Sequence, residues 1–287
     1  MSFGTARRVG LGLLLALPHC MPAPSPLAPD RHGSLGLPHR GTLDEGASLP
    51  AHGPGFARLR KDERHFGTTR LVGTIERAAS VVAREHPGSV LVVGDLSAPH
   101  GGRILPHLSH RSGRDADLLL YVTTLDGARI KSPGFVHFGP DGLAWDAASH
   151  RYLRFDVERE WLLVKTLVEA EDARIQWIFL NHALSPMLIE WARATGEPVE
   201  TIRRAQAVLL EPKPGGVHDD HTHIRTACSD DELRGGCDPN GPDRVWFPKG
   251  EDVLSSLSSL SARAPTTEQL VHEASAPLEE LLHGEAR

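Results

Sequence analysis

The sequence predicts an α+β domain in which helices flank a small, mostly antiparallel central sheet. Helical and β-branched stretches follow one another through the middle of the chain without a regular strand–helix–strand repeat. The chain has 287 residues, of which 40% are apolar, so it can bury a substantial core. A formal net charge of -6, without any long Lys/Arg run, argues against a nucleic-acid partner.

Residues 1–21 are predicted to be a signal peptide. Arg7 and Arg8 precede an apolar run at residues 9–17, which is too short to cross a bilayer. No other segment of the sequence is expected to span a membrane. A disordered or membrane-touching N-terminus is the alternative to export. Cys20 stands where a lipoprotein would carry its cysteine, but the residues before it are not the small ones expected there. Lipid anchoring is therefore the less favoured alternative.

Residues 22–58 are predicted to be a linker. They are rich in Pro, Gly, Ser and His and show no sustained period, so we expect them to bury little apolar surface. The predicted folded domain then occupies residues 59–250. The Ser/Ala-rich residues 251–287 have weak helical periodicity and are expected to form a peripheral tail.

The folded domain is predicted to begin with an amphipathic helix. Apolar residues recur at helical spacing between Leu71 and Val82. Thr68 or Thr69 can cap the start of this helix, and Pro87 follows where it must end. The later elements are expected, in order, as strands at residues 89–95 and 117–123, a helix capped by Asp156, a strand at 175–180, helices at about 185–194 and 199–210, and a last strand at 221–226.

Two of the three cysteines, Cys228 and Cys237, are predicted to form a disulfide. They stand nine residues apart in a polar loop that contains a Gly pair, and such cysteines oxidise in an exported protein. Zinc ligation by this pair is the weaker alternative, because no CxxC spacing accompanies it.

The first candidate metal-binding stretch is "SHRSGRDAD", residues 109–117. His110 and Asp117 would lie roughly 23 Å apart in a straight strand and roughly 10 Å apart along a helix axis. Zinc donors lie about 2.0 to 2.2 Å from the ion, so the chain must double back between these two residues. Gly113 can adopt the backbone dihedrals that such a turn requires.

The second candidate stretch is "HDDHTH", about a hundred residues downstream. On the predicted strand His221 and His223 point to the same face, because they are two residues apart. A set of His110, Asp117 and His223 leaves a fourth position open for water, as catalytic zinc sites do. His221 and His218 could then take a proton or steady the oxyanion during hydrolysis.

The alternative is that these histidines carry no chemistry. The chain has 17 histidines, and any single one is more often a surface or core residue than a ligand. The joint pattern argues against this alternative, since a His and an Asp flank a turn Gly before a strand and a close His pair follows far downstream.

Residues 94–122 ("GDLSAPHGGRILPHLSHRSGRDADLLLYV") and residues 215–228 ("GGVHDDHTHIRTAC") resemble the penicillin-insensitive murein endopeptidases. The family consists of zinc peptidases of the bacterial periplasm, which share a small-sheet fold with D-Ala-D-Ala carboxypeptidases and the hedgehog signalling domain. The likeness extends more loosely from about Phe66 to Cys228. It implies a zinc peptidase that cleaves D-alanyl to meso-diaminopimelyl cross-links in peptidoglycan, without a serine nucleophile.

The resemblance also assigns residues to roles. It implies zinc on His110, Asp117 and His223, with His221 and His218 as the active-site histidines. The wider superfamily often has Glu at the position of His218, so the identity of the general base stays open between these two histidines.

Other positions match the family pattern less closely. His107 matches a histidine that the family places at the metal site, although Pro106 falls where Gly is expected. Arg103 could hold a substrate carboxylate, or could be a surface residue beside a turn. Asp146 and His150 could contribute to a second metal, or could belong to a solvated loop.

Two other functions are compatible with the same motifs. A carboxypeptidase that trims a terminal D-Ala would use the same metal with a closed pocket for the free carboxylate. A wall-binding module would keep the zinc fold without catalysis. The presence of both His218 and His221 argues against such a module, because a structural zinc has little use for two spare histidines.

Overall fold

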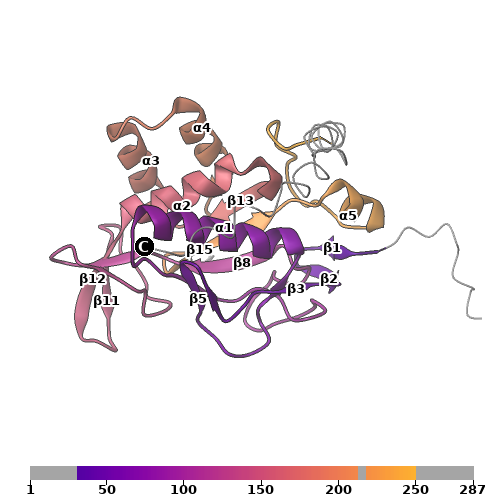
Figure 1. Cartoon of the computed structure of the whole chain (residues 1–287), viewed down its shortest axis with the longest axis horizontal. Helices are drawn as coiled ribbons and strands as arrows, with labels where there is room; N and C mark the ends of the chain where they lie inside the picture. The colour runs from indigo at the N-terminus through magenta and orange to yellow at the C-terminus, as the bar shows by residue number, and fades with distance from the viewer. Residues whose placement is uncertain (1–30, 213–217, 250–287) are drawn as a thin grey trace, which may run out of the picture. The chain divides into compact units, whose positions relative to one another are not determined.

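The computed structural model describes residues 31–212 and 218–249 (Figure 1). Its α+β fold confirms the fold class predicted from the sequence. The predicted signal peptide with Cys20, the first part of the predicted linker and the predicted C-terminal tail lie outside the described residues. Among the helices that are described, none has the length and apolar character needed to cross a membrane.

Seven strands form the main sheet. In spatial order they are β14 (Leu209–Leu210), β13 (Ile175–Phe179), β15 (His221–Thr226), β8 (Asp115–Leu119), β7 (Leu91–Val93), β5 (Phe56–Arg58) and β4 (His52–Gly53). Three of the predicted strands are therefore confirmed as β7, β13 and β15, whereas the predicted strand at residues 117–123 is divided between β8 and β9 (Val122–Thr124), which belong to different sheets.

The main sheet is mixed, which corrects the prediction of a single small, mostly antiparallel sheet. β5 pairs with β7 in parallel and β13 with β14 in parallel, while the other neighbours are antiparallel. Parallel neighbours need a long crossover connection. Helix α1 (Thr69–Glu85) lies between β5 and β7 in the chain, and α3 (Leu184–Ala194) and α4 (Val199–Val208) lie between β13 and β14. The likeness to the hedgehog domain stays a prediction.

Three smaller sheets accompany the main one. They consist of β1 (Gly33–Leu37) with β2 (Arg40–Asp44), of β3 (Ala47–Ser48) with β6 (Phe66–Gly67), and of β10 (Arg129–Ile130), β9 (Val122–Thr124), β12 (Arg151–Phe155) and β11 (Leu143–Asp146) in that order. The β1–β2 hairpin forms one wall of a cavity.

Residues 31–58 are folded, which corrects the prediction of a linker. Strands β1 to β5 lie in this segment, and Leu43, Leu49 and Phe56 are at most 2% exposed. The composition was misleading because the prolines lie in the connections between these strands, while four glycines lie within the strands themselves: Gly33, Gly36, Gly41 and Gly53. Strands of two to five residues are also too short to show a clear period.

The predicted helices are confirmed together with their start signals. α1 begins after Thr68, whose side chain accepts a hydrogen bond from the Leu71 backbone N–H at 3.2 Å. α2 (Val157–Glu169) begins after Asp156, whose carboxylate accepts from the Arg159 backbone N–H at 3.1 Å. α3 and α4 occupy the two later segments predicted as helical, and α5 (Asp230–Gly235) is an additional short helix.

Cys228 and Cys237 form a disulfide, which confirms the predicted pairing. The bond joins the chain just after β15 to the chain just after α5. Zinc ligation by these two cysteines is thereby excluded in this structure.

Strands β8 and β15 separate the core from the candidate site. Ala116, Leu118 and Ile224 are at most 1% exposed and belong to the hydrophobic core that α1 and α2 cover. Figure 1 shows both helices lying across this face of the sheet. Successive side chains on a strand point to opposite faces, so the intervening residues share the other face. They are Asp115, Asp117, His221, His223 and Arg225.

Glu160 of α2 is a buried carboxylate on the core side of the sheet. It accepts hydrogen bonds from the Thr222 hydroxyl at 2.7 Å and from the Tyr121 backbone N–H at 3.1 Å. Burial raises the pKa of Glu160 from 4.5 to about 7, and the two hydrogen bonds offset this only in part. The folded protein therefore keeps a proton that the unfolded chain releases. The stabilisation from this proton is fully present below pH 4.5, the pKa of Glu160 in the unfolded chain, and is lost as the pH rises through about 7, its pKa in the folded protein.

The Glu160→Gln substitution is expected to remove this pH dependence, because Gln does not titrate. We expect the parent protein to lose about 3 kcal/mol of unfolding free energy relative to the variant as the pH rises from roughly 4 to roughly 8. Urea denaturation of both proteins across this range measures the difference. Equal pH slopes in the two proteins would contradict the effect assigned to Glu160.

Candidate active site

The two histidine-containing stretches meet at Asp117, in the middle of β8. His223 of β15 pairs with Asp117 across the strands, and its Nδ1 lies 3.2 Å from Asp117 Oδ1. His221 projects from the same face of β15, and its Nε2 lies 3.3 Å from the same oxygen. Both histidines of the HxH pair therefore face one carboxylate.

His110 reaches Asp117 because the chain turns back between them. Gly113 has a φ of +73° and His110 itself a φ of +63°, both in the left-handed region. A Cβ on Gly113 would approach the Leu43 side chain to 2.5 Å, so the turn has no room for a larger residue. His110 is fully buried, and its Nε2 lies 3.2 Å from Asp117 Oδ1.

His107 lies beside the second oxygen of Asp117. Its Nδ1 is 3.7 Å from Asp117 Oδ2, and its Nε2 is 2.8 Å from Asp95 Oδ2. Burial raises the pKa of Asp95, but the hydrogen bond with His107 and the charge of Arg60 outweigh burial and lower it. Asp95 is a site residue that sequence reasoning missed, although it ends a predicted strand inside the motif that carried the resemblance.

The far nitrogen of each buried ring is held by an acceptor. His110 Nδ1 lies 3.1 Å from the Leu96 carbonyl oxygen, His223 Nε2 lies 2.8 Å from Asp115 Oδ1, and His221 Nδ1 lies 2.5 Å from Asp220 Oδ1. This leaves the other nitrogen of each ring directed at Asp117. Metal-ligating histidines are oriented in the same way, by a carboxylate or carbonyl behind the ring. Asp115 and Asp220 were also missed from the sequence.

Several buried polar atoms at this site have no hydrogen-bond partner within the described residues. They are His110 Nε2, both carboxylate oxygens of Asp117, and His218 Nδ1. Unpaired buried polar atoms are costly, and a cation that accepts their lone pairs would remove this cost.

There are two groups of residues in which the ligand atoms lie close enough together to hold one ion. The atoms offered by His107, His110 and Asp117 lie within 4.8 Å of one another, and so do those of His218, His221 and His223. Neutral imidazole and carboxylate are donors that zinc prefers. The residues of this site therefore fit a zinc ion.

The charges at the site are arranged around Asp117. Burial raises the pKa of Asp117, but the neighbouring histidines outweigh burial and hold it well below its usual range. Burial lowers the pKa of His221, but Asp117 and Asp220 outweigh burial and raise it to about 10. Burial and the two nearby histidines lower the pKa of His218 to about 4. His218 and His221 thus favour opposite protonation states at neutral pH.

Asp146 and His150, suggested above as a second metal site, lie at the end of β11 and in the turn that follows it. Asp146 accepts hydrogen bonds from the Ala148 backbone N–H at 3.1 Å and from the Ser149 hydroxyl. In the part of the chain that the structure describes, no close group of ligand atoms includes either residue. Asp146 is itself buried at the end of β11, whereas His150 is exposed in the turn, so only His150 fits the solvated loop.

Two further features concern a remaining candidate residue and an additional group of ligand atoms. Arg103 is exposed and lines a separate cavity. His137, Asp219 and Asp220 form a further close group of ligand atoms that sequence reasoning did not single out. This group adjoins the histidine cluster through Asp220, which also holds His221.

The fold and the site together define a class of protein. Histidines oriented from behind by a carboxylate or carbonyl, around one buried aspartate, are the arrangement found at metal sites in proteins. Residues 34–269 match the family model described as penicillin-insensitive murein endopeptidase, and the chain belongs to this family. It is therefore a hydrolase of the murein endopeptidase type, which confirms the resemblance found in the motifs.

Three relatives carry the same description, penicillin-insensitive murein endopeptidase. The protein of Klebsiella pneumoniae is 27% identical over 228 residues, which cover 79% of this chain and 75% of the relative. The protein of Pectobacterium atrosepticum is 29% identical over 202 residues, covering 70% and 66%. The protein of Yersinia enterocolitica is 28% identical over 190 residues, covering 64% and 62%. The chain thus spans 62% to 75% of the length of these relatives.

Proposed function

We propose that this protein is a zinc-dependent endopeptidase that hydrolyses D-alanyl to meso-diaminopimelyl cross-links of peptidoglycan in the periplasm. The observation that carries the proposal is the set of buried, unpaired ligand atoms around Asp117. Membership of the murein endopeptidase family supports the substrate class.

His110, Asp117 and His223 are the residues that would hold zinc, and His107 is the candidate for an additional ligand. His110 Nε2 and His223 Nδ1 each lie 3.2 Å from Asp117 Oδ1, and the Leu96 carbonyl and the Asp115 carboxylate orient the two rings. Zinc bound there would supply a Lewis acid that polarises the scissile carbonyl and acidifies the attacking water.

His221 and His218 would move the protons of the reaction. The His221 ring is fixed by Asp220 and by an edge contact with Phe135, whose ring centroid lies 5.5 Å away. The His218 ring centroid lies 5.1 Å from that of His221, and its buried Nδ1 has no hydrogen-bond partner among the described residues. One ring can take a proton from water while the other steadies the oxyanion or protonates the leaving amine.

The Asp115→Asn substitution is expected to lower the affinity for zinc by roughly 10- to 100-fold, because Asp115 orients His223 from behind. The same carboxylate accepts from Arg225 Nε at 2.6 Å, so Asn also leaves this arginine without its counter-charge. Competition with a chromophoric chelator measures the zinc affinity, and circular dichroism checks the fold. Asp172→Asn, at an exposed carboxylate, is the matched control. Equal zinc affinities in all three proteins would show that Asp115 does not position a ligand.

The proposed function is tested by incubating purified cross-linked muropeptide dimers with the protein. The products are separated by liquid chromatography and identified by mass spectrometry. We expect dimers to become monomers, with activity lost in a strong chelator and restored by zinc. Release of terminal D-Ala alone would support a carboxypeptidase instead. No cleavage by folded, zinc-loaded protein would support a binding module.

A further inference from the structure

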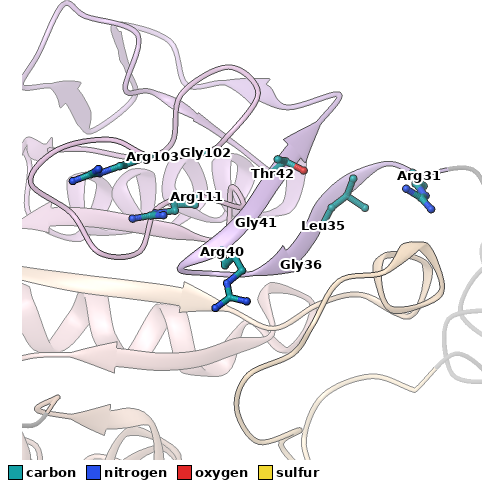
Figure 2. A pocket seen from close by; sticks show the side chains of 9 residues that line it. All are labelled: Arg31, Leu35, Gly36, Arg40, Gly41, Thr42, Gly102, Arg103 and Arg111. Carbon is teal, nitrogen blue, oxygen red and sulfur yellow. The ribbon is translucent and has the colours of Figure 1, made fainter.

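A cavity of about 410 Å³ lies between the β1–β2 hairpin and the loop at residues 101–111 (Figure 2). Four arginines line it. Figure 2 shows Arg31 and Arg40 on the hairpin side and Arg103 and Arg111 on the loop side. This volume falls within the range of small-molecule sites, so the cavity can hold a ligand group.

The charges of this cavity are unbalanced. Among the described residues that line it, none is acidic. Within the same described ranges, none of the four arginines forms a side-chain hydrogen bond or an ion pair, and Arg111 Nε is buried without a partner. Arg31, Arg40 and Arg103 are exposed, so water screens the repulsion between them, whereas the buried unpaired donor of Arg111 is costly. An anion bound in the cavity would pair with this donor and reduce the remaining repulsion.

The cavity and the histidine cluster share one loop. Arg111 directly follows His110, and Arg103 lies four residues before His107. The loop is closed by a hydrogen bond from the Gly102 backbone N–H to the Arg111 carbonyl oxygen at 2.8 Å. The same loop therefore carries two histidines of the cluster and two arginines of the cavity.

We propose that this arginine cavity binds a free carboxylate of the peptidoglycan stem peptide. This inference rests on the proposed function, which supplies a peptide substrate with carboxylates outside its peptide bonds, on glutamate and diaminopimelate. The planar guanidinium of Arg pairs with a carboxylate through two parallel N–H···O bonds. Arg103 and Arg111 are the pair best placed to do so, since both lie on the loop of the histidine cluster.

The test measures the KM and kcat of the zinc-loaded enzyme and its variants on cross-linked dimers. We expect Arg103→Gln and Arg111→Gln each to raise KM about tenfold and to change kcat by less than about twofold, since binding is lost without loss of chemistry. Arg193→Gln, at an exposed arginine of α3, is the charge-matched control and should leave both constants unchanged. Arg103 is exposed, so its variant stays informative even if Arg111→Gln disturbs the loop.

A second set of substrates identifies the bound group. Dimers in which each free carboxylate is amidated in turn are compared with the parent dimer. We expect one amide to raise KM for the parent enzyme about as much as Arg103→Gln does, and to add nothing in the Arg103→Gln variant. A KM that is independent of both arginines, or of every carboxylate, would overturn the proposal.

Two further outcomes must be distinguished from carboxylate binding: binding of phosphate instead, and failure of the parent protein to cleave dimers. Inorganic phosphate offers the same arrangement of oxygens, so its binding is measured by calorimetry. Phosphate binding that needs the arginines, without arginine-dependent peptide binding, would overturn the carboxylate assignment. If the parent protein cleaves no dimer, the proposed function fails, and calorimetric binding of the same peptides to parent and variants then decides the inference about the cavity.

Discussion

The His223→Ala substitution is expected to abolish zinc retention and peptidase activity together. His223 would be one of three protein ligands, and its Nδ1 faces Asp117 from the neighbouring strand. Loss of one ligand from such a set leaves the ion weakly held. We expect the zinc content after dialysis to fall below about a tenth of the parent value and kcat/KM on muropeptide dimers to fall at least about a thousandfold.

Zinc content is measured by elemental mass spectrometry, beside the dimer assay. His52→Ala, at an exposed histidine of β4, is the matched control and should retain both zinc and activity. A His223→Ala protein that keeps full zinc and full turnover would rule out the ligand assignment.

The Gly101→Ala substitution is expected to lower the free energy of unfolding by about 3 kcal/mol. Gly101 has a φ of +68°, and an added Cβ would lie 2.2 Å from the Arg111 carbonyl oxygen and 2.6 Å from the Leu43 backbone nitrogen. These are backbone atoms, which cannot rotate away as a flexible side chain would. The hairpin and the loop that carries His110 must therefore separate.

The Gly102→Ala substitution separates the steric clash expected at Gly101 from the cost of placing a Cβ on a left-handed backbone. Gly102 has a φ of +77°, but an added Cβ would meet nothing within 4 Å. We expect this variant to lose only about 1 kcal/mol, the cost of a left-handed backbone with a Cβ. Urea denaturation of both variants compares the two effects. Equal destabilisation would show that the close approach at Gly101 has little weight.

The helices and central strands could be predicted because their signals are local. Thr68 and Asp156 each cap a helix whose apolar residues follow within the next turns. The fold of residues 31–58 could not be predicted in this way, because its strands are stabilised by distant partners. β5 pairs with β7 across more than thirty residues, and the Leu43 backbone N–H donates to the His100 carbonyl oxygen.

The candidate ligands could be predicted because spacing constrains them. Two histidines in a strand at positions two apart must share a face, and Gly113 marks the turn that brings His110 back. The supporting carboxylates could not be distinguished in the same way. Asp95, Asp115 and Asp220 resemble any other acidic residue until the fold shows which ring lies beside each. The arginine cavity was missed for the same reason, since its two walls are about sixty residues apart in the chain.

Anomalous X-ray diffraction from crystals of the zinc-loaded protein, measured at the zinc absorption edge, shows where the ion binds. We expect a strong peak at bonding distance from His110, Asp117 and His223. Fully loaded crystals with no peak at these residues, or with zinc only elsewhere, would contradict this ligand assignment.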